Sequence, residues 1–405
     1  FVCWTPATME SMKRSPTFLV GTVQQKDILG EFQKREQHYT EEYSKNKPLC
    51  FSARAYQQPH PAKVRMGYKD ADATLTSPML LGVCDGVSQL EEFQMDPSLL
   101  PNELLKTCEE LAMLQLMPDT NVSPQDQYRG PISLLKEAYQ ETSSFGSTTV
   151  LLAALDNSTR IHGKLHPMIA VLSIGDCELL MLRRTNGRQS ELEAVFHTEM
   201  QRIDYNVQTP LQLARVDERI DEEFDESIAL EVIEKGSAVH CVSAYEGDVL
   251  ILGSDGVFDN LFLDEIVEIC NEILPAPTAN HFSPMPAQYL MKAAQRIVKE
   301  SHAKSDCVNG QFLDTPIGKG GKVDDTSVVV GEIIEWTEAH TQIWSEVRRN
   351  RRWKDVISCG GMQCGATRHA CSCEGDEDDK NRFRGRSEDA SEESSDEEEG
   401  ACSIA

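Results

Sequence analysis

The sequence predicts an α+β protein, because short apolar runs that suit buried strands occur beside longer stretches with helical spacing. Residues 78–84 and 249–252 are apolar runs, and each is followed closely by an Asp-Gly pair. Further strands are expected at residues 147–155, 168–174, 177–182 and 327–334, and helices at residues 97–116, 132–142, 259–273 and 286–302. Gly175-Asp176 is expected to form a hairpin turn between two strands, and Asp259-Asn260 to cap a helix.

Composition divides the chain into four regions. We expect a polar N-terminal extension at residues 1–48, with a helix near 27–43, and one large domain at residues 49–340. Residues 341–373 form a basic, Cys-containing extension. Residues 374–405 form an acidic tail, in which positions 374–399 hold 13 acidic and 4 basic residues, a composition typical of disorder.

The formal net charge of −27 excludes some classes of partner. Sequence-independent binding to nucleic acid requires a basic face, so we expect no nucleic-acid partner. No run approaches the ~18 apolar residues of a membrane span, so we expect no membrane partner either. We expect a monomer in the cytoplasm or nucleus with reduced thiols; because residue 1 is Phe, an organellar address stays open.

Aspartates stand at the ends of several predicted strands. Asp85, Asp176 and Asp255 each follow an apolar run, and Asp324 precedes another. Carboxylates and backbone carbonyls at such positions are ligands for hard divalent cations, and several carboxylates at one site need cations to neutralise them. An ordinary Asp-Gly turn is the alternative at each position. The residues alone therefore predict a candidate carboxylate metal site.

Five short segments resemble, in order, the motifs of the metal-dependent protein phosphatase 2C family. The segments are Leu-Gly-Val-Cys-Asp-Gly-Val at 81–87, Phe-Gly-Ser-Thr-Thr at 145–149, Ser-Ile-Gly-Asp-Cys at 173–177, Gly-Asp-Val-Leu-Ile-Leu-Gly-Ser-Asp-Gly-Val-Phe-Asp-Asn at 247–260 and Gly-Gly-Lys-Val-Asp-Asp-Thr-Ser-Val-Val at 320–329. The segment at 247–260 is the most specific. The first and last resemble the smaller branch of the family, which includes mitochondrial and plastid phosphatases.

This resemblance implies a fold and a site. The fold is a four-layer α-β-β-α sandwich, with two antiparallel sheets flanked by helices. Asp85, Asp255 and Asp324 would ligate one Mg²⁺ or Mn²⁺, and Asp85 with the carbonyl of Gly86 would meet a second ion. Asp176 would help to hold a weaker third ion. Water held by the metals would attack phosphorus directly, so we expect no phosphoenzyme and no Cys-x5-Arg phosphatase loop.

The match departs from the family at the first acidic motif, which usually reads Glu-Asp-Ala or Asp-Asp-Ala. Asp72-Ala73 is the register that we adopt for the metal site, and it puts Ala71 where an acid is expected. The other register uses Asp70-Ala71, preceded by Lys69. In either register, one contact to the second ion is lost or is supplied by a neighbouring residue.

Members of the family usually have, before the first motif, an arginine that binds the substrate phosphate. We expect Arg65 to bind the phosphate, with Arg54 as the second candidate, because a guanidinium holds phosphate by paired hydrogen bonds. The predicted function is hydrolysis of phosphoserine and phosphothreonine in phosphoprotein substrates. A catalytically impaired relative that acts as a regulatory or binding module is the alternative.

Overall fold

The computed structural model describes residues 47–118, 127–161, 163–185, 190–204, 207–217, 220, 224–276, 284–305, 307–308 and 311–359. The chain divides into two units, residues 1–343 and 344–405. The expected helix near 27–43 and the acidic tail lie outside the described residues. The described part of the second unit is helical and belongs to α10 (Glu338–Cys359).

Two five-stranded antiparallel sheets form the centre of the first unit. The first sheet has the order β1 (Leu49–Gln58), β20 (Thr326–Glu335), β15 (Val249–Gly253), β9 (Glu178–Arg183), β10 (Glu193–His197). The second has the order β14 (Ala238–Ser243), β8 (Met168–Ile174), β5 (Val150–Asp156), β3 (Leu80–Cys84), β2 (Ala73–Thr76). Leu49 pairs with Glu335 along the β1–β20 ladder, which places a strand that sequence analysis missed at a sheet edge.

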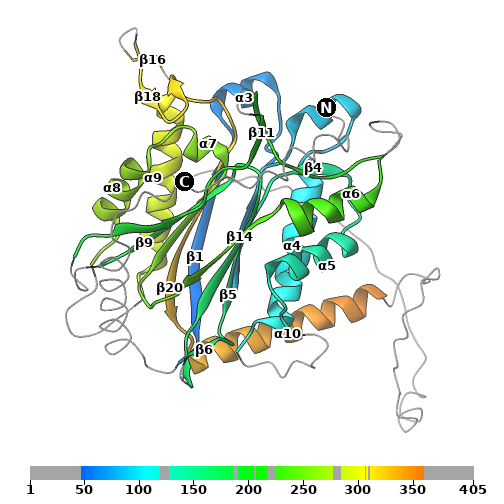
Figure 1. Cartoon of the computed structure of the whole chain (residues 1–405), viewed down its shortest axis with the longest axis vertical. Helices are drawn as coiled ribbons and strands as arrows, with labels where there is room; N and C mark the ends of the chain where they lie inside the picture. Colours follow the sequence, from blue (N-terminus) through cyan, green and yellow to red (C-terminus); the bar gives the residue numbers. More distant parts are fainter. Residues whose placement is uncertain are drawn as a thin grey trace, which may run out of the picture. The chain divides into compact units, whose positions relative to one another are not determined.

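Helices cover the outer face of each sheet (Figure 1). On the first sheet lie α8 (Leu263–Ile273) and α9 (Ala287–Lys304), whose apolar residues Ile266, Ile297 and Val298 share a buried cluster with β15 and β20. On the second lie α4 (Leu99–Gln115) and α5 (Pro131–Glu141). The predicted four-layer α-β-β-α sandwich is therefore confirmed.

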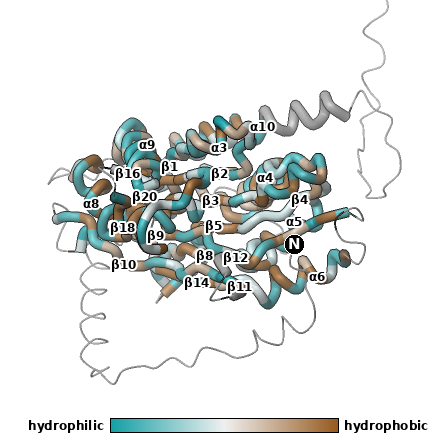
Figure 2. Tube along the Cα trace, turned by 90° about the horizontal axis from the view of Figure 1, so that it is seen from above, coloured by the Kyte–Doolittle hydropathy of each residue, from teal (hydrophilic) through white to brown (hydrophobic). Residues whose placement is uncertain are grey.

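The inner core lies between the two sheets. Leu81 and Val83 of β3 are buried in one cluster with Leu250 and Leu252 of β15, which are inaccessible to solvent. Burial of each such side chain contributes roughly 1.5–3 kcal/mol of transfer free energy. Figure 2 shows brown, hydrophobic segments along the strands of the two sheets. The packed sheets thus hold the ends of β3 and β15 in fixed positions.

The connection between β8 and β9 differs from the predicted hairpin. The two strands belong to different sheets, so Gly175-Asp176 carries the chain across the sandwich. Gly175 has φ of +104°, and a Cβ there would meet Thr149 Cγ2 at 2.6 Å. The sequence pattern could not show that β8 and β9 lie in different sheets, because both strands are buried on both faces and neither alternates between apolar and polar residues.

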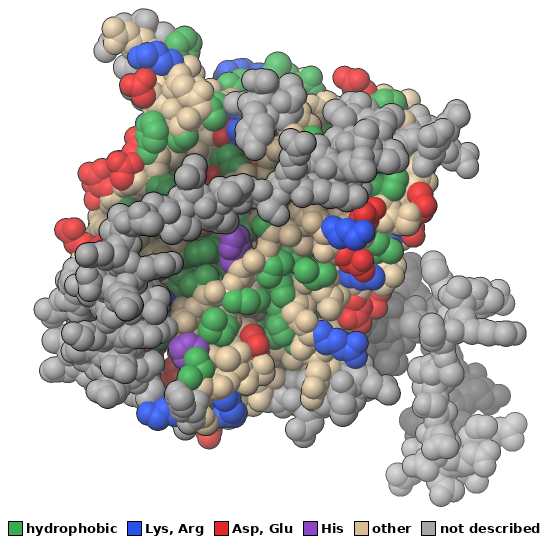
Figure 3. All heavy atoms as spheres, viewed as in Figure 1, with side chains coloured by type: hydrophobic (Ala, Val, Ile, Leu, Met, Phe, Trp, Pro, Cys, Tyr) green, Lys and Arg blue, Asp and Glu red, His purple; other side chains and the backbone are tan. Residues whose placement is uncertain are grey.

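The view in Figure 3 looks toward β14, which ends the second sheet, and shows hydrophobic side chains gathered in the middle of this face. Val239 of β14 is 39% exposed and Cys241 is also exposed. Among the residues that the structure describes, no helix has the length and apolar character that crossing a bilayer requires.

Candidate metal and active site

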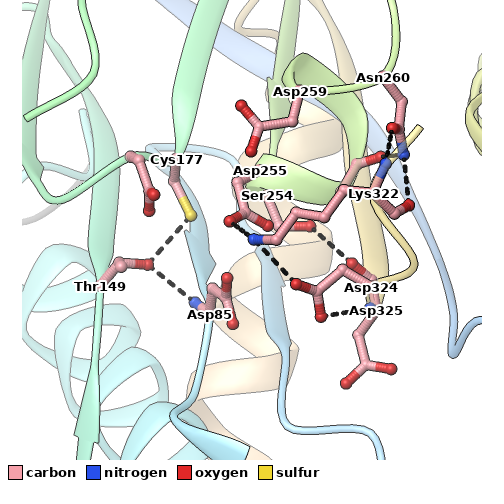
Figure 4. Close-up of polar contacts among 12 residues, drawn as sticks. Asp85, Thr149, Cys177, Ser254, Asp255, Asp259, Asn260, Lys322, Asp324 and Asp325 are labelled. Carbon is pink, nitrogen blue, oxygen red and sulfur yellow. Dashed lines mark hydrogen bonds and ion pairs between the residues drawn. The ribbon is translucent and has the colours of Figure 1, made fainter. Parts of the chain in front are cut away.

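Three of the predicted aspartates lie close together at one end of the sandwich. Asp85 follows β3, Asp255 follows β15 and opens the short helix α7 (Asp255–Phe258), and Asp324 precedes β20. Burial raises the pKa of Asp85 well above its usual value, and the charges of Asp255 and Asp324 raise it further. Figure 4 shows the three carboxylates around one region. The structure therefore brings together the acids that the sequence places far apart.

The glycine after each aspartate permits a close approach of another chain segment. A Cβ on Gly86 would lie 2.5 Å from the carbonyl oxygen of Ala71. A Cβ on Gly256 would lie 2.2 Å from the carbonyl oxygen of Asp325. Any larger residue would therefore push away the segment that carries Asp72 or Asp324. An ordinary Asp-Gly turn does not require such close contact with another segment, so both glycines are needed for packing.

Asp72 is the buried acid of the first motif. It directly precedes β2 and is 3% exposed, and neither side-chain oxygen accepts a hydrogen bond within the described structure. Burial raises its pKa well above the usual value, and the nearby acids Asp70 and Asp325 add to this effect. Ala71 is buried beside it, and its N–H lies 3.4 Å from Asp325 Oδ2.

Lys322 places an ammonium group among these acids, which sequence analysis did not anticipate. Its Nζ contacts Asp255 Oδ2 and lies 2.9 Å from Asp324 Oδ2 (Figure 4). Although burial opposes the charge on Lys322, the two carboxylates raise its pKa. Burial also raises the pKa of Asp255, to about 7, in opposition to Lys322.

Lys63 is a second cation in the site. It lies on helix α3 (Pro61–Met66), and its Nζ is 2.9 Å from Asp324 Oδ1 and 2.7 Å from Asp325 Oδ2. Asp324 therefore contacts two ammonium groups. Although burial opposes this effect, Lys322 and Lys63 hold the pKa of Asp324 below its usual value.

Within the described residues, neither of the two arginines predicted to bind phosphate contacts the acids of the site. Arg65 is exposed on α3, and Arg54 is exposed on β1 with its Nη1 donating to the Ala53 carbonyl at 2.6 Å. Residues two apart on a helix point about 200° apart, so Lys63 and Arg65 of α3 face different sides. The role of Arg65 stays a prediction.

Asp176 lies beside the cluster and is held by Arg202. Asp176 is 1% exposed, and its Oδ2 is 3.5 Å from Arg202 Nε. Arg202 Nη2 also donates to both oxygens of Asp259, at 2.8 and 3.0 Å. The predicted helix cap at Asp259-Asn260 is therefore wrong. Instead, α8 begins after Phe262, whose N–H is bound by Glu265 Oε2 at 2.9 Å.

The donor chemistry of the site fits hard divalent cations. Buried carboxylate oxygens that accept no hydrogen bond within the described structure are Asp72 Oδ1 and Oδ2, Asp176 Oδ1, Asp255 Oδ1 and Asp325 Oδ1. Such oxygens are costly unless a cation pairs with them. As the described side chains stand, however, no three Asp, Glu, His or Cys residues are arranged to hold an ion. The ammonium groups supply part of the missing positive charge.

Buried thiols lie beside the acids but have no nucleophilic character. The spacing Cys-x5-Arg, which we expected to be absent, occurs once, at Cys177 and Arg183. Arg183 ends strand β9, and its Nε pairs with Asp248 Oδ1 at 2.6 Å, so these residues form no phosphate-binding loop. Burial raises the pKa of Cys177 well above the usual value, and its Sγ contacts Thr149 Oγ1 at 3.1 Å. Such a thiol stays protonated.

Comparison with known proteins gives a consistent assignment. No family model matches the chain. The chain is 27% identical over 298 residues to the probable protein phosphatase 2C 26 of Arabidopsis thaliana, an alignment that covers 71% of this chain and 85% of that protein. It is 26% identical over 271 residues to the protein phosphatase PTC7 homolog of Xenopus laevis, covering 64% of this chain and 78% of the relative.

A solved structure shares the fold. The photosystem II phosphatase PBCP superposes with a TM-score of 0.50 at 24% identity, covering 70% of this chain and 98% of that chain. Its likeness supports the sandwich architecture, and the sequence relatives support the assignment of the motifs. The chain is therefore similar in sequence to relatives named as protein phosphatases 2C, and similar in fold to a solved phosphatase.

Proposed function

We propose that the chain is a metal-dependent protein phosphatase that hydrolyses phosphoserine and phosphothreonine in proteins. The observation that carries this proposal is the meeting of Asp85, Asp255 and Asp324 at one end of the two sheets. These residues come from three segments far apart in the sequence, and each is buried or half-buried. Natural sequences accept the cost of gathering like charges mainly where a cation or a reaction uses them.

The proposed roles follow the positions of the side chains. Asp85, Asp255 and Asp324 would hold one Mg²⁺ or Mn²⁺, Asp85 and the Gly86 carbonyl would reach a second ion, and Asp176 would serve a third. The two Asp72 oxygens, which accept no hydrogen bond within the described structure, would be further ligands for the second ion in place of the acid missing at Ala71. Bound ions would lower the pKa of water and neutralise charge on the phosphoryl group.

The side chains of this chain favour direct attack by water. Cys177 is the thiol that contacts the site through Thr149, and burial keeps it protonated. Thr149 Oγ1 accepts the Asp85 N–H at 3.1 Å, so this hydroxyl holds the backbone of a metal ligand. Neither group is placed as a nucleophile, which supports a reaction without a phosphoenzyme.

The proposed function is tested by a Mn²⁺ titration of the full chain with an aryl phosphate and a phosphothreonine peptide. We expect turnover that requires the metal and falls at least about 100-fold in the Asp255→Asn variant, since even residues behind a metal ligand typically contribute 10–100-fold. Asp314→Asn is the matched control, because that carboxylate is 74% exposed and pairs with Lys319. Equal loss in both variants, or turnover without metal, would reject the proposal.

Two observations favour the second candidate, a regulatory or binding module with impaired catalysis. Ala71 stands at the usual acid position, and Lys322 lies between two proposed ligands. This candidate requires that the wild-type chain, saturated with Mn²⁺, hydrolyses neither substrate while it still binds a phosphothreonine peptide. Calorimetric titration with that peptide distinguishes the two functions.

A further inference from the structure

Lys322 occupies the space between the two carboxylates that we propose as shared ligands of one ion. Its Nζ contacts Asp255 Oδ2 and is 2.9 Å from Asp324 Oδ2. The side chain is 30% exposed, whereas that of Asp255 is 4% exposed. A divalent cation bound by both carboxylates would stand where the ammonium group now lies, and the two positive charges would repel each other strongly in a partly buried site.

The backbone of Lys322 is fixed by one buried side chain. Asn260, which is 1% exposed, accepts the Lys322 N–H through Oδ1 at 2.6 Å and donates from Nδ2 to the Lys322 carbonyl at 3.1 Å. The same Nδ2 donates to the Gly256 carbonyl at 2.9 Å, in the turn that follows Asp255. Only the side chain of Lys322 is therefore free to leave, and its partial exposure gives it a route to solvent.

Lys63 stabilises the arrangement when Lys322 leaves. It contacts the other oxygen of Asp324, Oδ1, and also Asp325 Oδ2. Its side chain is 12% exposed and comes from α3, whose first turn is capped by His60 Nδ1 accepting the Ala62 N–H at 3.1 Å. Asp324 thus keeps one counter-ion from a fixed helix while its Oδ2 becomes available to a metal.

We propose that Lys322 is a built-in cation that neutralises Asp255 and Asp324 in the metal-free protein and must swing out before the divalent ion binds. This inference rests on the proposed metal-dependent function. The exchange sets the metal affinity: the ion binds only by displacing an ammonium group that already pairs with its ligands. The metal-free protein in turn stays folded, because Asp255 and Asp324 keep a counter-ion in the absence of the metal.

The first test measures displacement directly on the wild-type chain. The protein is labelled briefly with an amine-reactive reagent, with and without saturating Mn²⁺, and each lysine is quantified by peptide mass spectrometry. We expect labelling of Lys322 to rise severalfold with Mn²⁺, since an ion-paired ammonium group reacts slowly. Lys319, which is 77% exposed, serves as the internal control and should not change. Unchanged labelling of Lys322 at saturating Mn²⁺ would overturn the proposal.

The second test is calorimetric titration of Mn²⁺ into the wild type, Lys322→Gln and Lys319→Gln. We expect Lys322→Gln to bind Mn²⁺ about tenfold more tightly, because no ammonium group competes for the ligands. Lys319→Gln removes the same charge nearby and should bind as the wild type does. Equal or weaker binding by Lys322→Gln, or the same gain in both variants, would refute the exchange. Absence of metal-dependent turnover in the wild type would instead reject the proposed function, whatever the affinities.

Discussion

Replacement of Gly256 by alanine tests how closely the acids must approach. The added Cβ would lie 2.2 Å from the Asp325 carbonyl oxygen and 2.8 Å from Thr326 Oγ1. Because ordinary contacts are about 3.4 Å or longer, the segment that carries Asp324 must move by roughly 1 Å. Backbone cannot yield as a flexible side chain does, so we expect a loss of about 1–3 kcal/mol in the free energy of unfolding.

The effect on catalysis should exceed the effect on stability. A displacement of about 1 Å in a reacting constellation can cost roughly 100-fold in rate. We expect kcat/KM for an aryl phosphate to fall by about that factor in Gly256→Ala at saturating Mn²⁺, while urea unfolding still shows a folded protein. Gly236→Ala is the matched control, because its Cβ would meet the flexible end of Leu211 at 3.2 Å and Val232 Cγ1 at an ordinary 3.6 Å. Near wild-type kcat/KM in Gly256→Ala would refute the close approach.

Three further predictions concern the charges. Folding raises the pKa of Asp255 to about 7, from about 3.8 in the unfolded chain. The protonated carboxyl therefore stabilises the folded state below pH 3.8, and this contribution is lost as the pH rises through 7. The melting temperature in EDTA should fall between about pH 4 and 8, and it should fall less steeply in Asp255→Asn. Asp72→Asn should raise stability in EDTA at pH 7, since it removes a buried carboxyl group whose oxygens accept no hydrogen bond within the described structure and whose ionised form is costly to bury, yet weaken Mn²⁺ binding measured by calorimetry. Arg202→Gln should destabilise the protein by about 3 kcal/mol in urea unfolding, because it removes the guanidinium group that pairs with both Asp176 and Asp259; a change below about 0.5 kcal/mol would contradict that pairing.

The strand-end acids were predictable because each follows a short apolar run with an adjacent glycine. The reason for the glycine was not, since the sequence does not show that Gly86 approaches Ala71 or that Gly256 approaches Asp325. The crossing at Gly175 was hidden for a related reason: β8 and β9 are buried on both faces, so neither shows the alternation that assigns a strand to a sheet.

The cations of the site were the least predictable feature. A lysine in a charged segment is usually a solvated residue, and nothing in the spacing marks Lys322 or Lys63 as a partner of the acids. Arginine was the expected phosphate contact near α3, but helical geometry sends Lys63 toward Asp324 while Arg65 is exposed. Long side chains with several rotamers are placed by their tertiary partners, which sequence reasoning does not supply.

The most direct measurement is an anomalous-difference map from crystals of the chain soaked in Mn²⁺. The account predicts at least one strong peak within about 2.5 Å of carboxylate oxygens of Asp85, Asp255 and Asp324, with the Lys322 ammonium group moved away from Asp255. A map that shows peaks only at exposed acids, with Lys322 still between Asp255 and Asp324, would contradict it.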